Sequence, residues 1–240
     1  MIDIHCHILP GLDDGPADLA GSLRMAAELA RLGFRQVFAT PHVPWGSAQV
    51  DMKAFVERDL ALIEKMSSEG CPLKLRLAAE HYSDVVPQLI HESGPLCFPR
   101  GDTFLMEFPL SGLPARFEDL LFLAEVKKKK PVIAHVERYP EVQADPAAVN
   151  ALRQRGCYLL VNLSGLAGEW SKQARKTAVA LVEKGLVDAA TTDLHSADRS
   201  QAIAEGLHVL DDLVGREGVD RMLRTTPAEI AGLDQPLEQH

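Results

Sequence analysis

The chain has 240 residues, of which 46% are hydrophobic and 25% are charged. These values are typical of one large globular domain or two small ones, and they exclude a disordered, collagen-like or disulfide-scaffold protein. The formal net charge is −9, and the basic residues form no stripe, so we expect no nucleic-acid partner. The one cationic run, residues 127–130, precedes Pro131 and fits the C-terminus of an amphipathic helix.

The sequence also bears on the compartment of the protein. No apolar stretch approaches the roughly 20 residues that span a bilayer. Asp3, His5 and His7 stand where a secretory signal needs basic and apolar residues. The four cysteines occur singly, at Cys6, Cys71, Cys97 and Cys157. Isolated cysteines are typical of reduced thiols. We therefore expect a cytoplasmic protein that does not insert into a membrane.

Short β-prone runs alternate with segments of helical periodicity along the whole chain. The predicted strands are residues 1–8, 36–40, 73–77, 103–106, 131–134, 157–161 and 187–191. Apolar residues at helical spacing follow the first two strands, at 19–30 and 52–63, and precede the fifth, at 120–126. Such alternation indicates a parallel sheet with helices outside it. No low-complexity linker divides the chain, so residues 1–240 are predicted to form a single α/β domain.

A TIM-like barrel is the expected architecture, because about seven strand–helix units follow one another without a break. A doubly wound open sheet is the alternative. The first strand–helix turn, residues 10–15, is not a Gly-x-Gly-x-x-Gly dinucleotide turn, which counts against the open sheet of a Rossmann protein.

Polar side chains stand where the predicted strands end. In chain order these residues are His5, His7, His42, Glu80, Glu107, His135, Asn162, Asp193 and His195. The carboxyl ends of parallel barrel strands meet on one face, where catalytic sites are built. Imidazoles and carboxylates are the ligands of hydrolytic Zn²⁺, Mn²⁺ or Fe sites, and the missing cysteine ligands argue against a structural zinc site. The pattern predicts a metal site. The remaining histidines, His81, His91, His208 and His240, lie outside it and are expected to have no such role.

Residue spacing adds geometry to this prediction. Residues i and i+2 of a strand point the same way, so His5 and His7 are expected to face one ion together while Cys6 faces away. The same alternation lets Asp193 and His195 point inward together.

Charge indicates more than one ion. The acidic residues expected on this face are Asp14, Glu80, Glu107 and Asp193. Two divalent ions would neutralise their four charges, and three would leave about +2. Such a cavity selects anions, and phosphate esters are the obvious class. Arg138 follows His135 closely and is expected to bind phosphate oxygens; the alternative is a surface ion pair with Glu137 or Glu141.

These residues carry a family signature. Residues 1–15, Met-Ile-Asp-Ile-His-Cys-His-Ile-Leu-Pro-Gly-Leu-Asp-Asp-Gly, resemble the opening of the polymerase-and-histidinol-phosphatase (PHP) superfamily. The resemblance is greatest to its bacterial protein-tyrosine phosphatases of capsule and exopolysaccharide loci, the CpsB/CapC/YwqE type. Later blocks match in order: Ala39–His42, Ala79–Glu80, Met106–Pro109, Pro131–Tyr139 and Thr192–His195. The match spans roughly residues 1–200.

The resemblance implies a distorted seven-stranded barrel, the PHP fold, with two or three divalent ions. Mn²⁺ is the expected metal, with Fe, Zn²⁺ or Mg²⁺ as alternatives. By position, His5, His7, Glu107 and Asp193 would hold one ion, Asp14, His42 and His195 a second, and Glu80, Glu107 and His135 the third. Glu107 would therefore bridge two ions and serve the catalytic centre directly. Arg138 matches the phosphate-binding arginine of the family, and Arg199 matches a second one after a one-residue shift.

The implied activity is metal-dependent hydrolysis of phosphotyrosine without a phospho-enzyme. A cysteine-based phosphatase needs an arginine six residues after its cysteine, and the four positions hold Leu12, Leu77, Thr103 and Leu163. The implied partner is the tyrosine-rich tail of a membrane-bound polysaccharide-export kinase. Pro44, Trp45 and Tyr82 could form an apolar wall for the ring. Three alternatives remain: a histidinol-phosphate or other small-molecule phosphatase, a nuclease-like phosphoesterase, which the acidic charge disfavours, and a non-catalytic metal-binding scaffold.

Overall fold

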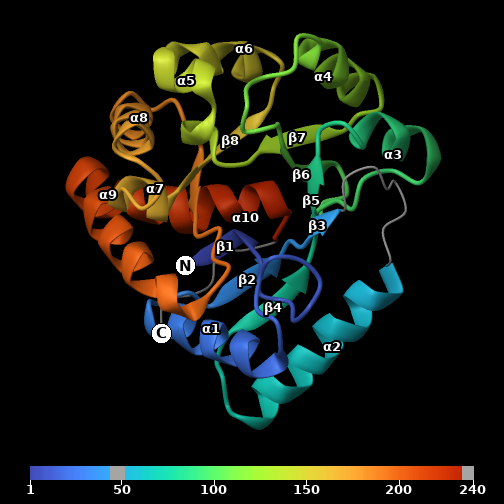
Figure 1. Cartoon of the computed structure of the whole chain (residues 1–240), viewed down its shortest axis with the longest axis vertical. Helices are drawn as coiled ribbons and strands as arrows, with labels where there is room; N and C mark the ends of the chain where they lie inside the picture. The colour runs from blue at the N-terminus through green and yellow to red at the C-terminus, as the bar shows by residue number, and fades with distance from the viewer. Residues whose placement is uncertain (44–51, 234–240) are drawn as a thin grey trace.

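A computed structural model describes residues 1–43 and 52–233, without the side chains of residues 52–55 (Figure 1). The strands are β1 (Ile2–Cys6), β2 (Gln36–Ala39), β3 (His42–Val43), β4 (Lys74–Leu77), β5 (Glu80–Tyr82), β6 (Thr103–Glu107), β7 (Lys130–Ile133), β8 (Tyr158–Asn162) and β9 (Ala189–Thr191). The α-helices are α1 (Leu19–Arg31), α2 (Met52–Ser68), α3 (Val86–Glu92), α4 (Phe117–Val126), α5 (Pro140–Ala144), α6 (Val149–Gln154), α7 (Leu163–Ala167), α8 (Lys172–Glu183), α9 (Ser200–Asp220) and α10 (Thr226–Ala231). All seven predicted strands and the three predicted helical segments are present.

Parallel pairing joins these strands into two sheets, in the orders β1-β2-β4 and β3-β5-β6-β7-β8-β9. Backbone hydrogen bonds continue between the sheets, since the Ala78 amide donates to Ala39 and the Glu80 amide to Pro41. The pairs β2/β3 and β4/β5 are therefore two interrupted strands, which leaves seven strand positions. Pro41 has no amide hydrogen to donate, which accounts for one interruption.

The ring of strands closes between β1 and the segment after β9. Cys6 forms a parallel bridge with Leu194, the Asp193 amide donates to the His5 carbonyl at 2.9 Å, and the His7 amide donates to the Leu194 carbonyl at 3.0 Å. The predicted barrel is therefore confirmed over the alternative of an open sheet. The helices surround this barrel (Figure 1).

An apolar core fills the amino-terminal half of the barrel. It includes Ile2, Ile4, Phe38, Leu105, Val132 and Leu160, with Ala228 and Ile230 from α10. The Thr103 hydroxyl donates to the Ile230 carbonyl at 2.6 Å, which fixes α10 across this end. With this end packed, polar side chains gather at the carboxyl ends of the strands.

The lysine run, residues 127–130, follows the C-terminus of a helix, as predicted. Helix α4 ends at Val126, and the run continues into β7. The Lys129 ammonium donates to the Gly101 carbonyl at 2.6 Å, and that of Lys130 lies 3.5 Å from the centre of the Tyr158 ring. These local partners suit a helix-to-strand connection.

In the described part of the chain, no helix combines the length and apolar composition required to cross a membrane.

Candidate metal centre

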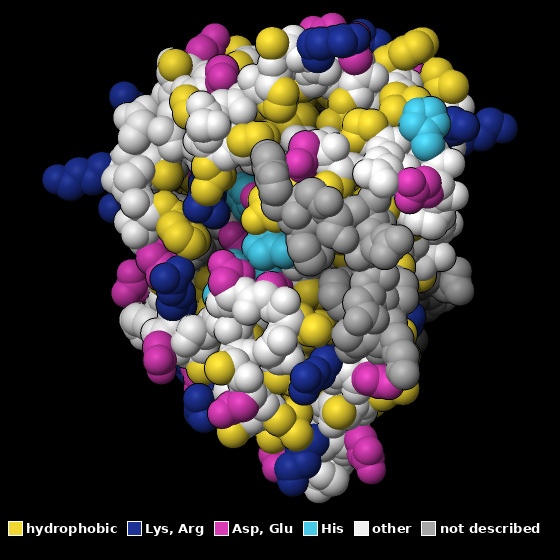
Figure 2. Space-filling model, turned by 45° about the vertical axis from the view of Figure 1, so that its right-hand side comes forward, with side chains coloured by type: hydrophobic (Ala, Val, Ile, Leu, Met, Phe, Trp, Pro, Cys, Tyr) yellow, Lys and Arg dark blue, Asp and Glu magenta, His cyan; other side chains and the backbone are white. Residues whose placement is uncertain are grey.

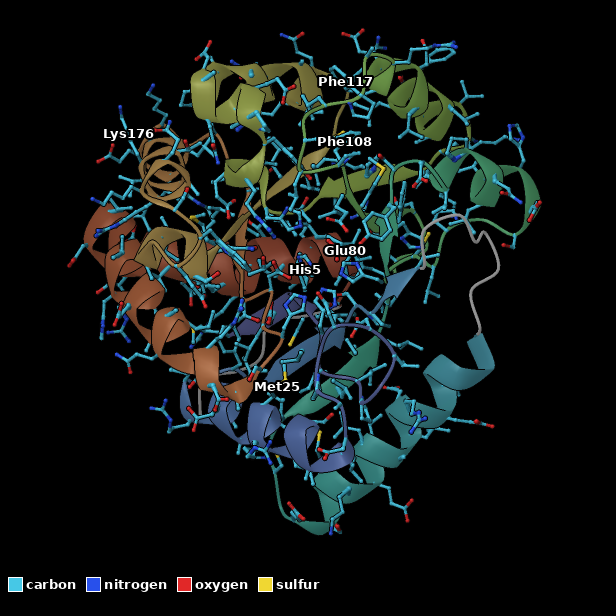
Figure 3. All side chains as sticks on the ribbon, in the orientation of Figure 1. His5, Met25, Glu80, Phe108, Phe117 and Lys176 are labelled. Carbon is cyan, nitrogen blue, oxygen red and sulfur yellow. The ribbon has the colours of Figure 1, made fainter. Side chains whose placement is uncertain are left out.

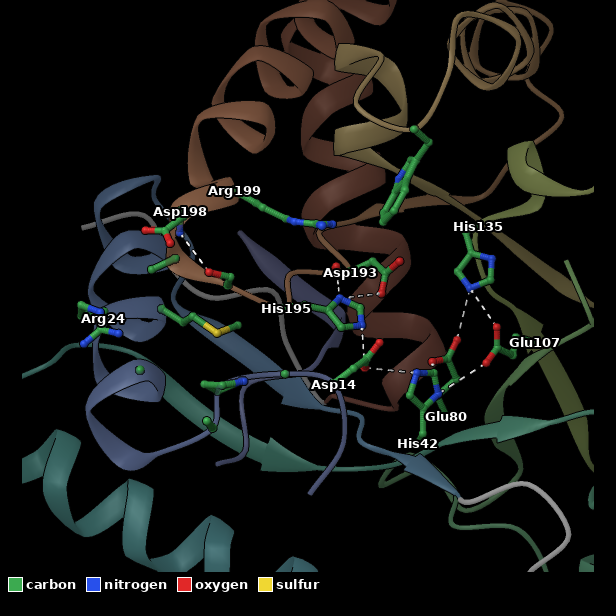
Figure 4. Close-up of a pocket in the computed structure, with 18 of the residues that line it drawn as sticks. Asp14, Arg24, His42, Glu80, Glu107, His135, Asp193, His195, Asp198 and Arg199 are labelled. Atoms are coloured by element: carbon green, nitrogen blue, oxygen red, sulfur yellow. Dashed lines mark hydrogen bonds and ion pairs between the residues drawn. The ribbon is translucent and has the colours of Figure 1, made fainter. Parts of the chain in front are cut away.

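The predicted ligands meet at the carboxyl ends of the strands, in and beneath a cavity of about 620 Å³. Figure 2 shows histidine and acidic side chains at the bottom of the corresponding hollow in the surface. The residues that line the cavity include Asp14, His42, Glu80, Glu107, His135, Arg138, Asp193, His195 and Arg199 (Figure 4). His5 and His7 lie deeper and contact this set.

The deepest group combines His5 of β1 and His7, which follows β1, with Glu80 and Asp193. The Nε2 atoms of the two histidines are 3.2 Å apart. His5 Nε2 lies 3.3 Å from both Glu80 Oε1 and Asp193 Oδ1, and Figure 3 shows His5 and Glu80 directed toward each other. Cys6 belongs to the core outside the barrel, so the predicted alternation is confirmed. Ligands about 2.1 Å from one ion lie about 3.0–3.4 Å apart, which these separations match.

Two further groups adjoin the first. His135 Nε2 lies 3.3 Å from Glu80 Oε1 and 3.5 Å from Glu107 Oε2. On the other side, Asp14 Oδ1 lies 3.2 Å from His195 Nε2 and 3.6 Å from His42 Nε2. Side chains from six parts of the chain thus form one continuous cluster.

The contacts favour Glu80 over Glu107 as the shared carboxylate. Glu80 lies within 3.3 Å of His5, His7 and His135 and within 3.1 Å of His42. Glu107 lies 3.4 Å from His42 and 3.5 Å from His135. Glu80 therefore reaches the deepest group as well as that of His135, whereas the contacts of Glu107 are with His42 and His135.

The donor atoms fit bound cations. Oε1 of Glu80 and Oε1 of Glu107 are buried and have no hydrogen-bond partner among the described residues. Imidazole nitrogens nevertheless lie 3.3 and 3.4 Å from these two oxygens. Buried acceptors are normally hydrogen-bonded, and an ion is one explanation for an exception.

Two imidazoles are also oriented as metal ligands. His7 Nδ1 lies 2.7 Å from Asp13 Oδ2, and His195 Nδ1 lies 2.9 Å from the Asp193 carbonyl. Because each of these oxygens can only accept, Nδ1 carries the proton and Nε2 faces the cluster. A second partner of this kind is the usual companion of a metal-binding histidine.

Electrostatics in the cluster follow from burial and opposite charges. Burial alone would lower the pKa of His135, but the adjacent carboxylates of Glu107 and Glu80 outweigh it and raise that pKa to about 10. Burial opposes ionisation of Asp193 too, yet nearby imidazoles, His5 first, hold the pKa of its carboxyl below the ordinary value. The Asp193 carboxylate therefore stays ionised and needs a neighbouring positive charge, a role that divalent metal ions can fill.

The backbone is strained at two of the candidate ligands. His135 has a φ of 37° and Asp193 a φ of 49°, both in the left-handed region that non-glycine residues rarely adopt. Each costs on the order of 1 kcal/mol and persists only where the surroundings enforce it. The conformation turns each side chain into the cluster directly after β7 and β9.

Sequence reasoning missed two supports of this cluster, Asp13 and Asp3, and it placed a third, Asn162, on the same face without a role. Asp13 accepts from His7 and from the His42 amide, at 2.7 and 3.2 Å. Asp3 accepts from the Thr192 amide at 3.1 Å, which ties β1 to the segment before Asp193. Asn162 donates to Asp193 Oδ2 at 2.8 Å. The position of Asn162 at the end of a predicted strand was the signal that included it, and Asp3 and Asp13 gave no comparable signal.

The two candidate arginines reach the cavity from separate 3₁₀ turns. Arg138 Nη1 lies 3.9 Å from Asp193 Oδ2, and Arg199 Nε lies 3.4 Å from Glu169 Oε1. Glu137 is buried and accepts from the Asn162 amide, while Glu141 accepts from the Leu113 amide. The alternative of a surface ion pair between Arg138 and either glutamate is therefore not found among the described contacts.

Trp170 and Leu110, which the sequence did not single out, also line the cavity, and so does Tyr82. The Tyr82 ring stacks on His42 at 5.3 Å between centres. Pro44, Trp45 and His240 lie outside the described residues.

His81 is a core residue, as the sequence analysis expected. Its side chain is 0% exposed. Nδ1 donates to the Leu105 carbonyl at 2.8 Å, and Nε2 accepts from the Leu96 amide at 3.1 Å. Burial lowers its pKa to about 4, so the ring is neutral and both nitrogens are satisfied.

We predict that His81→Ala lowers the free energy of unfolding by about 2–4 kcal/mol, because it leaves a cavity and two unpaired polar groups. Denaturant unfolding measures this, with exposed His91→Ala as the control, expected within about 0.5 kcal/mol of the parent. Metal content per folded molecule should stay unchanged. Loss of metal at unchanged stability would instead make His81 a ligand.

The fold and the cluster together define a class, the α/β barrels with a multi-histidine metal site at the carboxyl ends of their strands. A model of the CpsB/CapC family, of capsular polysaccharide synthesis, matches residues 1–231. The chain belongs to this family.

Individual relatives agree with this assignment. The chain is 33% identical over 224 residues to the tyrosine-protein phosphatase YwqE of Bacillus subtilis, a match that covers 90% of this chain and 86% of that protein. It is 29% identical over 205 residues to the tyrosine-protein phosphatase CpsB of Streptococcus pneumoniae, covering 82% and 84%. A solved structure from work on these two proteins, described as unique metal-dependent tyrosine phosphatases, superposes over both full chains with a TM-score of 0.88 at 31% identity.

Proposed function

We propose that this protein is a metal-dependent protein-tyrosine phosphatase acting on the phosphotyrosine tail of a membrane-bound kinase that controls capsule or exopolysaccharide synthesis. The observation that carries the proposal is the cavity in which a His/Asp/Glu cluster lies beside two guanidinium groups. The names of the relatives supply the substrate class. Such a kinase tail lies in the cytoplasm, so we place this protein there, with residues 1–240 as one catalytic domain.

The clustered side chains would hold three divalent ions, with Mn²⁺ as the expected metal and Fe, Zn²⁺ or Mg²⁺ as alternatives. His5, His7, Glu80 and Asp193 would hold the first ion, Glu80, Glu107 and His135 the second, and Asp14, His42 and His195 the third. Bound there, the ions would supply Lewis acidity toward the phosphoryl group and water.

The chain itself would bind and orient the ester. The guanidinium groups of Arg138 and Arg199 would donate to phosphoryl oxygens, for which their planar geometry is suited. Leu110 is 43% exposed at the cavity, and together with the ring of Tyr82 it would pack against the phenyl ring of the substrate.

Substrate and metal can be tested together on the purified protein. Its metal content is measured, and hydrolysis of a phosphotyrosine peptide, a matched phosphoserine peptide and histidinol phosphate is followed with Mn²⁺ and with EDTA. We expect phosphotyrosine to be preferred, because its phosphorus lies further from the peptide backbone and its phenolate, with a pKa of about 10, leaves more readily than an alkoxide. EDTA should abolish activity and Mn²⁺ restore it. Faster hydrolysis of histidinol phosphate would favour a small-molecule phosphatase, and no hydrolysis a scaffold.

The cysteines provide a separate test of mechanism. Cys6 and Cys157 are buried, and burial raises the pKa of both thiols, so neither is a ready nucleophile. We predict that Cys6→Ser, Cys71→Ser, Cys97→Ser and Cys157→Ser each keep kcat within about threefold of the parent at saturating metal. Mass spectrometry of quenched reactions should detect no phosphorylated enzyme. Trapping of a phosphocysteine would overturn the mechanism.

A further inference from the structure

We propose that Trp170 is a positioning residue that holds Arg138 and Arg199 over the metal centre for phosphate binding, an inference that rests on the proposed function. The Arg138 guanidinium carbon lies 4.2 Å from the centre of the Trp170 ring, and that of Arg199 lies 5.4 Å away. Arg138 belongs to the turn after β7 and Arg199 to the turn after β9, while Trp170 lies between α7 and α8. One ring thus joins two arginines from separate parts of the barrel.

The Trp170 ring is itself anchored. Its Nε1–H donates to the Ser164 hydroxyl at 3.1 Å, and Ser164 is buried in α7, directly after β8. Glu169, the preceding residue, lies 3.4 Å from Arg199 Nε. The indole plane is therefore fixed relative to the barrel. Figure 4 shows the Arg199 side chain directed into the cavity near Asp193.

The Trp170 ring interacts electrostatically with both guanidinium groups. Two guanidinium groups facing one cavity repel each other before an anion binds, and the negative face of an indole attracts both. Asp193 competes for Arg138, since its Oδ2 lies 3.9 Å from Arg138 Nη1 while its Oδ1 faces His5. Without the indole, Arg138 is free to close on Asp193, where it would pair with a candidate metal ligand instead of with phosphate.

Substitution of Trp170 separates this role from simple packing. Trp170→Leu keeps apolar bulk but removes the aromatic face, and Trp170→Phe keeps a face but removes the bond to Ser164. For Mn²⁺-loaded protein, we expect Trp170→Leu to raise KM for the phosphotyrosine peptide and the inhibition constant of inorganic phosphate about tenfold, with kcat within twofold. Trp170→Phe should recover most of this loss. An unchanged phosphate constant in Trp170→Leu would overturn the proposal.

A double-mutant cycle supplies the decisive control. In an Arg138→Ala/Arg199→Ala background, Trp170→Leu should change neither constant further, because its two partners are gone. An equal tenfold loss in that background would mean that Trp170 acts by packing or by direct contact with substrate, and would overturn the positioning role.

Fluorescence provides a readout that does not depend on turnover. The sequence has two tryptophans, Trp45 and Trp170, so Trp45→Phe makes Trp170 the sole emitter. Titration of this Mn²⁺-loaded variant with inorganic phosphate should give a saturable change in emission as the arginines move onto the anion. The change should vanish in Arg138→Ala/Arg199→Ala, and a flat titration despite calorimetric phosphate binding would overturn the proposal. A saturable change without phosphotyrosine hydrolysis would support it while rejecting the proposed function.

Discussion

Glu80→Gln is expected to cost more than about 100-fold in kcat/KM and to lower the amount of bound metal by more than one ion per molecule. The side chain is 1% exposed and lies within 3.3 Å of His5, His7 and His135. An amide of the same shape removes one negative charge and offers one oxygen in place of two, so two neighbouring cations would lose their common ligand. Mutation of a hydrogen-bond partner of a metal ligand already costs about 10–100-fold in metal affinity or activity. Loss of a shared ligand should therefore cost more than about 100-fold.

Two matched carboxylates serve as controls for this prediction. Glu107→Gln should release less metal than Glu80→Gln, because Glu107 reaches His42 and His135 but not the deepest group. Glu137→Gln should keep the full metal complement. That carboxyl is equally buried, accepts from the Asn162 amide, and has a pKa that burial raises to about 7. Elemental analysis after gel filtration measures the metal content of all three variants. If Glu107→Gln released more metal than Glu80→Gln, Glu107 would be the bridging ligand, as the family resemblance implies.

Periodicity sufficed for the barrel because six of its seven strand positions contain an apolar run that is buried on both faces, and β4 shows a clear alternation of buried and exposed residues. It could not predict that two strands are interrupted. β3 has two residues and β5 three, too short for any alternation to be visible, and the break at Pro41 depends on the neighbouring strands. The left-handed backbone at His135 and Asp193 could not be predicted from the sequence either, because neither residue is glycine.

Most of the clustered side chains could be predicted from residue types and positions alone, since histidines and acids at the ends of parallel strands gather at the carboxyl edge of a barrel. Which of these residues contact one another could not be predicted. Asp13 and Asp14 are adjacent in sequence, and only the turn of the chain decides that Asp13 supports His7 while Asp14 faces His195. Trp170 stands in a connection between helices, where no periodicity distinguishes a ring that contacts two arginines from one that anchors a loop.

Arg138→Ala should lower kcat/KM for a phosphotyrosine peptide by roughly 30- to 150-fold, which corresponds to the 2–3 kcal/mol of a lost charge-assisted contact. The guanidinium lines the cavity and lies beside Asp193 and Trp170. Arg138→Lys should recover only part of the loss, because an ammonium cannot donate to two phosphoryl oxygens in one plane. Steady-state kinetics on the Mn²⁺-loaded variants, with inorganic phosphate as a competitive inhibitor, measures both effects.

Arg153→Ala is the matched control, since Arg153 lies on α6 and donates to the Gly185 carbonyl away from the cavity. Its kcat/KM should stay within about twofold of the parent. Metal content must be measured alongside, because Arg138 also faces Asp193. Full metal occupancy with weaker phosphate inhibition would locate the defect in anion binding. A variant that loses metal but binds phosphate normally would show that Arg138 acts on the ligand cluster through Asp193, and would remove it from the substrate-binding residues.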